Sequence, residues 1–183
     1  MRGQSGLSSG DRMRRLEEGY LRYAAYGFLL LFFYVLQMTP RLLPTIAGGR
    51  PLLLIPAIVC VGMFTNPLTG GICGAVTGFV WDMFASHAIG LNALYLLAVG
   101  CACGLLVQLL MRNNILSALL LSTAATALQL LGDWLIDCVL WRLPGSGQVL
   151  LQQALPNFLY TVALSLPVYY LTLRVAKRLK LSR

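Results

Sequence analysis

Charged side chains are scarce in this sequence. They make up 11% of its 183 residues, whereas hydrophobic residues make up 58%; soluble domains usually carry about 25% charged residues. The mean hydropathy of +0.75 is too apolar for a water-facing surface, which needs polar side chains to cover the core. The composition therefore excludes a soluble enzyme, a disordered chain and a secreted disulfide-rich domain, and it predicts one integral membrane domain.

Cysteine and histidine are too few and too scattered to form a metal centre. The single histidine, His87, falls in a short loop, where a solvated side chain is the simpler interpretation. A zinc site needs four converging ligands, but the cysteines form no CxxC pair and all lie in apolar segments. These cysteines are Cys60, Cys73, Cys101, Cys103 and Cys138. We expect no metal, no cofactor and no disulfide, because a thiol buried in lipid meets no oxidant.

Motifs for catalysis are missing as well. The sequence contains no GxSxG elbow, no HExxH, no P-loop and no GxGxxG after a strand, which are the local patterns of hydrolases, metalloproteases and nucleotide-binding enzymes. We therefore predict that the chain is not an enzyme.

Most of the positive charge lies at the two ends of the chain, whose net charge is +8. Flanking basic clusters of this kind face anionic lipid headgroups and orient a membrane protein. They are Arg12, Arg14, Arg15 and Arg22 before the first apolar run, and Arg174, Lys177, Arg178, Lys180 and Arg183 around the end of the last. Because the membrane explains this charge, we expect a lipid bilayer as a partner and no nucleic acid.

Apolar runs divide the chain into six expected membrane helices, since about 20 apolar residues cross roughly 30 Å of hydrocarbon. The second run is short enough to be a re-entrant segment instead, and Pro156 and Pro167 predict a kink or a late start in the sixth. The expected spans are residues 21–39, 52–65, 70–86, 89–111, 115–140 and 152–173. The predicted fold is thus an all-α polytopic bundle.

Six spans place both termini on one side of the membrane. With the termini inside, eleven Lys and Arg lie on the inner side and three on the outer side, which fits the positive-inside rule. We expect a multi-pass protein of the bacterial inner membrane with both termini in the cytoplasm. Its parts are a flexible cytoplasmic tail over residues 1–19, the six-helix domain over 20–175 and a basic cytoplasmic tail over 176–183.

Acidic residues inside apolar segments are candidates for function. Asp133 and Asp137 are spaced i, i+4 on one helical face, where they could share a proton, bind a cation, be wetted at the outer interface, or pair with Arg142. Asp82 lies within the third segment, and either ion binding or a hydrogen bond to a neighbouring helix end would explain it.

Glycine forms the strongest pattern in the sequence. Gly70, Gly74 and Gly78 recur every four residues, and Gly100 and Gly104 repeat the spacing in the next segment. Small residues at this spacing let helix backbones approach closely in a membrane. The stripe is a candidate for packing inside the bundle or for contact with another protein.

The stretch from Gly74 through Gly78 and Asp82 to Gly90, with Ala93-Leu94 after it, resembles the signature segment of the MreD family of rod shape-determining membrane proteins. In that family a GxxxGxxxD helix leads into a Gly-x-x-Ala-Leu start of the next helix. The last segment, from Leu155 to Tyr169, is similar to the family's final helix. The resemblance covers residues 20–178, and the long charged start departs from the family's shorter one.

The resemblance implies a non-catalytic adaptor of the cell-elongation machinery. Its expected partners are an MreC-like scaffold, a wall-synthesis polymerase and transpeptidase, and, indirectly, MreB filaments. Asp82 and the Gly74 and Gly78 face match the family's pattern, whereas Asp133 and Asp137 have no secure counterpart.

Two alternatives remain open at this point. Small six-helix proteins with glycine-rich early helices are also similar in architecture to the S components of energy-coupling-factor vitamin transporters, which bind a vitamin in an outward pocket. The membrane aspartates alone would suit a channel or an ion carrier.

Overall fold

The computed structural model describes residues 9–39, 51–84, 90–109, 114–140 and 154–181, with side chains over 23–39, 51–84, 90–109, 114–135 and 154–178. These residues form helices and no strand, so the all-α class is confirmed for them. The helices are α1 (Ser9–Met38), α2 (Leu54–Phe64), α3 (Pro67–Phe84), α4 (Leu91–Leu109), α5 (Ile115–Leu140) and α7 (Leu155–Leu181).

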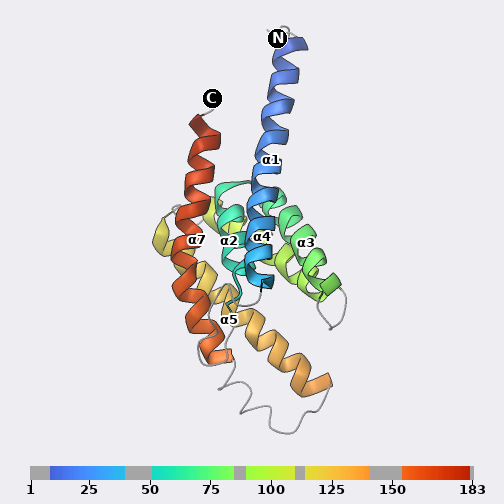
Figure 1. Ribbon diagram of the computed structural model, residues 1–183, viewed down its shortest axis with the longest axis vertical. Coiled ribbons are helices and arrows are strands. Elements are labelled where there is room, and N and C mark those ends of the chain that lie inside the picture. Colours follow the sequence, from blue (N-terminus) through green and yellow to red (C-terminus); the bar gives the residue numbers. More distant parts are fainter. Residues whose placement is uncertain (1–8, 40–50, 85–89, 110–113, 141–153, 182–183) are drawn as a thin grey trace.

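Successive helices run in alternating directions, and the first turns of α1 and the last turns of α7 lie at the same end of the molecule (Figure 1). Both helices project beyond the others at that end. The arrangement agrees with an even number of passes through a membrane.

Two helices are longer than their apolar runs. α1 begins at Ser9 rather than at residue 21, so residues 9–19, expected to be flexible, are helical. This stretch is rich in Arg, Met, Leu and Glu, which are strong helix formers. For the same reason α7 continues through its basic end to Leu181 instead of stopping at 173. The fifth expected span, 115–140, coincides with α5.

α2 lies in the centre of the bundle. Every residue from Leu54 to Met63 is buried, and the helix contacts α1, α3, α4, α5 and α7. Its 11 residues span about 16 Å at 1.5 Å per residue, roughly half of the hydrocarbon thickness. α2 is therefore a core helix shielded from lipid by its neighbours.

Side chains of two other helices satisfy the start of α2. The backbone N–H of Leu54 donates to Oε1 of Gln37 on α1 at 3.1 Å, and that of Leu52 donates to Oγ1 of Thr161 on α7 at 2.9 Å. The first N–H groups of a helix have no partner within it, and inside a membrane water does not replace one. Gln37 thus supplies an acceptor for the first turn of α2, and Thr161 supplies one for the residue that leads into its N-cap, Leu53.

By length and composition, three helices in the described part of the chain can cross a membrane: Leu91–Leu109, Ile115–Leu135 and Leu155–Arg178. The apolar stretches Tyr23–Met38 and Leu54–Phe64 are shorter. α3 has 18 residues, but its glycines and Asp82 make it less apolar. Six complete spans thus remain a prediction.

Candidate functional site

Asp82 lies in the last turn of α3 and is 2% exposed. Its Oδ2 accepts hydrogen bonds from the backbone N–H of Gly90 at 2.9 Å and of Ala93 at 3.1 Å, and its Oδ1 accepts one from Nδ2 of Asn92 at 2.8 Å. All three donors belong to the start of α4. A carboxylate at this position is also favoured by the partial positive charge of a helix N-terminus.

Gly90 explains why α4 needs a capping side chain from elsewhere. Its carbonyl accepts the first hydrogen bond of α4, from the Leu94 N–H at 3.0 Å, so Gly90 occupies the N-cap position, where a Ser or Asp side chain usually accepts from an N–H two or three residues on. Glycine has no such side chain, and its φ of +101° is a conformation that favours glycine. Asp82 supplies the missing acceptor from the preceding helix.

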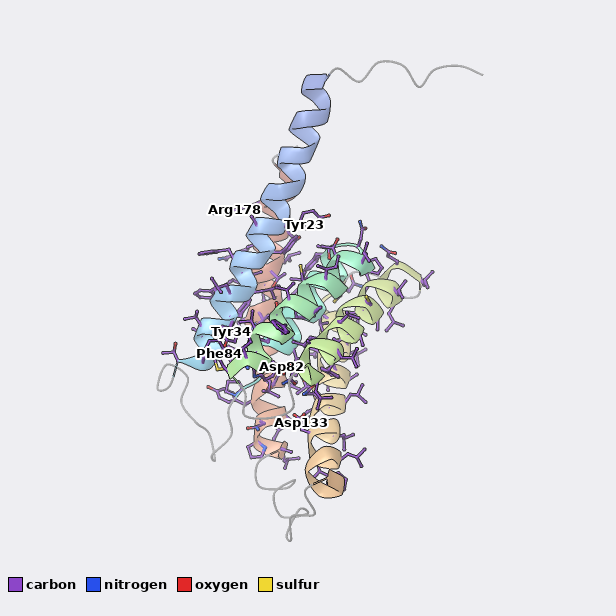
Figure 2. The ribbon with its side chains drawn as sticks, turned by 90° about the vertical axis from the view of Figure 1, so that its right-hand side faces the viewer. Tyr23, Tyr34, Asp82, Phe84, Asp133 and Arg178 are labelled. Carbon is purple, nitrogen blue, oxygen red and sulfur yellow. The ribbon has the colours of Figure 1, made fainter. Side chains whose placement is uncertain are left out.

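The polar contacts continue from α4 to α5. Asn92 Oδ1 accepts a hydrogen bond of 2.9 Å from Nε2 of Gln129, and the same amide donates to Oδ1 of Asp133 at 3.0 Å. The Gln129 side chain is 6% exposed, whereas Asp133 is exposed. We call Asp82, Asn92, Gln129 and Asp133 the polar chain; it joins three helices toward one end of the bundle (Figure 2).

In every hydrogen bond of the polar chain, the chemistry of the side chains fixes which group donates and which accepts. The two carboxylates accept only, when ionised, while each amide donates through nitrogen and accepts through oxygen. The direction runs from Gln129 through Asn92 to Asp82, with Gln129 also donating to Asp133. No buried side-chain nitrogen or oxygen in the described residues lacks a partner. The arrangement holds α3, α4 and α5 in one register.

The glycine stripe lies in the contact between α3 and α4, on the turns of α3 that precede Asp82. A methyl group at Gly78 would lie 2.5 Å from Cα of Ala93, and one at Gly74 would overlap the backbone carbonyl of Leu96. One at Gly70 would lie 2.8 Å from the Gly100 carbonyl oxygen. The stripe is therefore occupied by the chain's own α4.

The opposite face of α3 carries large apolar side chains. They are exposed and follow the helical repeat: Leu68, Ile72, Val76, Phe79 and Met83. Small residues inside and large apolar residues outside are the pattern of a helix that packs tightly on one side and meets lipid or another membrane protein on the other.

Several of the other candidates lie outside the part of the chain whose side chains the structure describes. Asp137 lies on α5 one turn after Asp133, but its side chain is outside the described residues, as are Arg142 and His87. Cys60, Cys73, Cys101 and Cys103 are free thiols. No group of three or more metal-ligating side chains occurs in the described part of the chain.

Sequence reasoning did not identify Gln129, Gln37 or Thr161 as structural residues. Gln129 stands one turn before Asp133 in an apolar helix, and a polar side chain in such a helix usually faces the bundle interior. That signal indicates burial of Gln129. Its partner, Asn92, is 37 positions away, and no local sequence pattern pairs the two residues.

The hydrogen bonds at this site hold helices α3, α4 and α5 together. The Asp82 oxygens are engaged by donors from α4, and the neighbouring amides are engaged by each other. Of the four side chains in the polar chain, Asp82 and Gln129 are buried, Asn92 is partly exposed and Asp133 is exposed.

Comparison with known proteins gives one match. Residues 20–175 match the family described as rod shape-determining protein MreD. No curated protein and no solved structure matches the chain, and the likeness to transporter S components gains no support from these comparisons.

Proposed function

Because the chain belongs to the MreD family of rod shape-determining proteins, we propose that it is a non-catalytic membrane adaptor of the cell-elongation machinery. The family match carries this proposal, since it covers residues 20–175 and so includes almost all of the helical bundle. The adaptor binds an MreC-like scaffold and couples MreB filaments to the polymerase and transpeptidase that build peptidoglycan.

The setting we propose is the bacterial inner membrane. The bundle crosses it six times, with α2 as a short central pass, and both termini are cytoplasmic. The apolar helices, the basic ends and the position of α1 and α7 at one end of the molecule support this topology (Figure 1). A C-terminal green fluorescent protein should then fluoresce, and a C-terminal alkaline phosphatase should be inactive; the reverse pattern would contradict the topology.

The site geometry supports a binding role more than a chemical one. Asp82, the buried one of the two carboxylates whose side chains the structure describes, receives three hydrogen bonds that fix α4 on α3. A rigid α3 in turn presents a constant apolar outer face, of which Ile72, Val76 and Phe79 are exposed members. Such a face suits a transmembrane segment of a partner, because helix association in lipid depends on shape and packing.

Depletion of the protein from its own cells tests the proposal. We expect cells that lose their rod shape and widen, and we expect re-expression of the natural chain to restore constant width. The matched control is Gly27→Ala, which changes a glycine with nothing within 4 Å of the added methyl group and should restore shape equally well. Depleted cells that grow as normal rods would contradict the adaptor function.

A further inference from the structure

An apolar groove lies between α1 and α7 on the outside of the bundle. Its volume is about 370 Å³. The side chains that line it are Ala25, Phe28, Leu29 and Phe32 of α1, and Leu171 and Val175 of α7. Phe28 is 73% exposed, so the groove is open to the surroundings, which in a membrane are lipid.

The lining of the groove is apolar along its length. The α1 residues from 25 to 32 span about 10 Å, and every side chain that lines the groove is aliphatic or aromatic. A hydrocarbon chain packs against such side chains at carbon–carbon distances of about 4 Å. The groove therefore offers a surface along which a single acyl chain can lie.

Two arginines of α7 neighbour the residues that line the groove, because Arg174 precedes Val175 and Arg178 follows it by about one turn. Arg174 and Arg178 are exposed, and Arg178 follows Leu171 and Val175 at the spacing that puts all three on one face of α7. Helical side chains generally lean toward the N-terminus of their helix, and for Arg178 this direction leads toward Val175 and the groove. Arg178 lies near the level of Tyr23 on α1, toward the end where α1 starts (Figure 2).

The charge around this end is positive on balance. α7 contains no acidic residue, and residues 9–22 of α1 carry four arginines against Asp11, Glu17 and Glu18. A guanidinium binds phosphate oxygens through two parallel hydrogen bonds. An apolar groove with Arg174 and Arg178 as exposed neighbours is complementary to a lipid with a hydrocarbon tail and an anionic head.

We propose that the groove between α1 and α7 binds one anionic phospholipid, with an acyl chain against Phe28 and Leu171 and the phosphate at Arg178 and Arg174. The bound lipid fills the space between α1 and α7 and ties the projecting end of α7 to the membrane surface. The inference uses only the membrane setting of the chain, so its failure would leave the adaptor proposal standing.

Native mass spectrometry of the delipidated protein tests the headgroup contact. The probes are phosphatidylglycerol and phosphatidylcholine with identical acyl chains, and the variant is Arg178→Gln. A basic group near anionic lipid contributes about a fivefold difference in affinity. We therefore expect Arg178→Gln to lower the affinity for the first bound phosphatidylglycerol molecule by about that factor. The control is Lys177→Gln, an exposed neighbour that does not share the groove-lining face, and it should have little effect.

A second pair of variants tests the groove itself. Ala25→Phe fills the space for the acyl chain and should reduce binding of the first lipid, whereas Ala24→Phe changes an exposed residue outside the groove lining and should not. Glycerol phosphate without acyl chains should not compete.

Three results would overturn the proposal: equal losses in Arg178→Gln and Lys177→Gln, equal binding of the two lipids, or unchanged binding in Ala25→Phe. Because Arg178 is exposed, its variant should retain the natural fold, which circular dichroism checks.

Discussion

The Asp82 carboxylate accepts a hydrogen bond of 2.9 Å from the backbone N–H of Gly90, which is the N-cap residue of the following helix. A residue in the last turn of α3 thus caps α4. The contact accounts for the pairing of a buried aspartate with a glycine eight positions later. Glycine has no side chain for capping, and the aspartate supplies the acceptor.

Asp82→Asn should lower the thermal stability of the purified protein, with a loss of about 1–3 kcal/mol in the free energy of unfolding. The asparagine oxygen can still accept from Gly90 and Ala93, but its NH₂ group then meets the NH₂ group of Asn92, which now donates to Asp82. Stability equal to that of the natural chain would show that the hydrogen bond from Asn92 to Asp82 contributes nothing.

Adding Asp133→Asn to Asp82→Asn should recover part of this loss. With an amide at both ends, Asn92 and Gln129 can each rotate by half a turn, so that Gln129 accepts from Asn92 and from position 133. In the Asp82→Asn single variant, the unchanged Asp133 prevents this reversal, because a carboxylate offers no donor. A double-mutant cycle should give a favourable coupling of about 0.5–1.5 kcal/mol, and additive effects would contradict the directional chain.

Gly78→Ala should destabilise the fold by about 1–3 kcal/mol through overpacking, since its methyl group would lie 2.5 Å from Ala93 Cα. Gly27→Ala is the matched control, because its methyl group meets open space and alanine is the better helix former. The melting temperature of each purified variant in detergent measures the effect of both substitutions on stability. The account fails if the two variants behave alike.

Thr161→Val should destabilise the bundle by about 1 kcal/mol, because it leaves the partly buried Leu52 N–H without its acceptor. Thr161→Ser keeps the hydroxyl and should retain most of the stability. Thr172→Val serves as the control: that hydroxyl is equally buried but donates only to the Val168 carbonyl of its own helix. Equal losses at positions 161 and 172 would argue against a special role in starting α2.

Sequence alone predicted the features that depend on local pattern. The range 115–140 and the repeat of Gly70, Gly74 and Gly78 are local signals, as is the family-like segment ending at Gly90. The family match over residues 20–175 confirms that resemblance.

The rest depends on contacts between distant residues. Local hydropathy did not show that residues 9–19 continue a helix, because composition at a charged end indicates polarity more strongly than conformation. Nor did it show that Gln37 and Thr161 supply acceptors at the start of a helix of 11 residues inside the bundle. Side-chain capping across 17 and 109 positions depends on the tertiary arrangement, which no single segment specifies.

The most direct test of the adaptor function is purification of the tagged protein in detergent from its own cells, followed by mass spectrometry of the proteins that accompany it. The account predicts recovery of a coiled-coil periplasmic scaffold together with wall-synthesis enzymes. Recovery of two ATPases and a large coupling membrane subunit, without the scaffold, would contradict it.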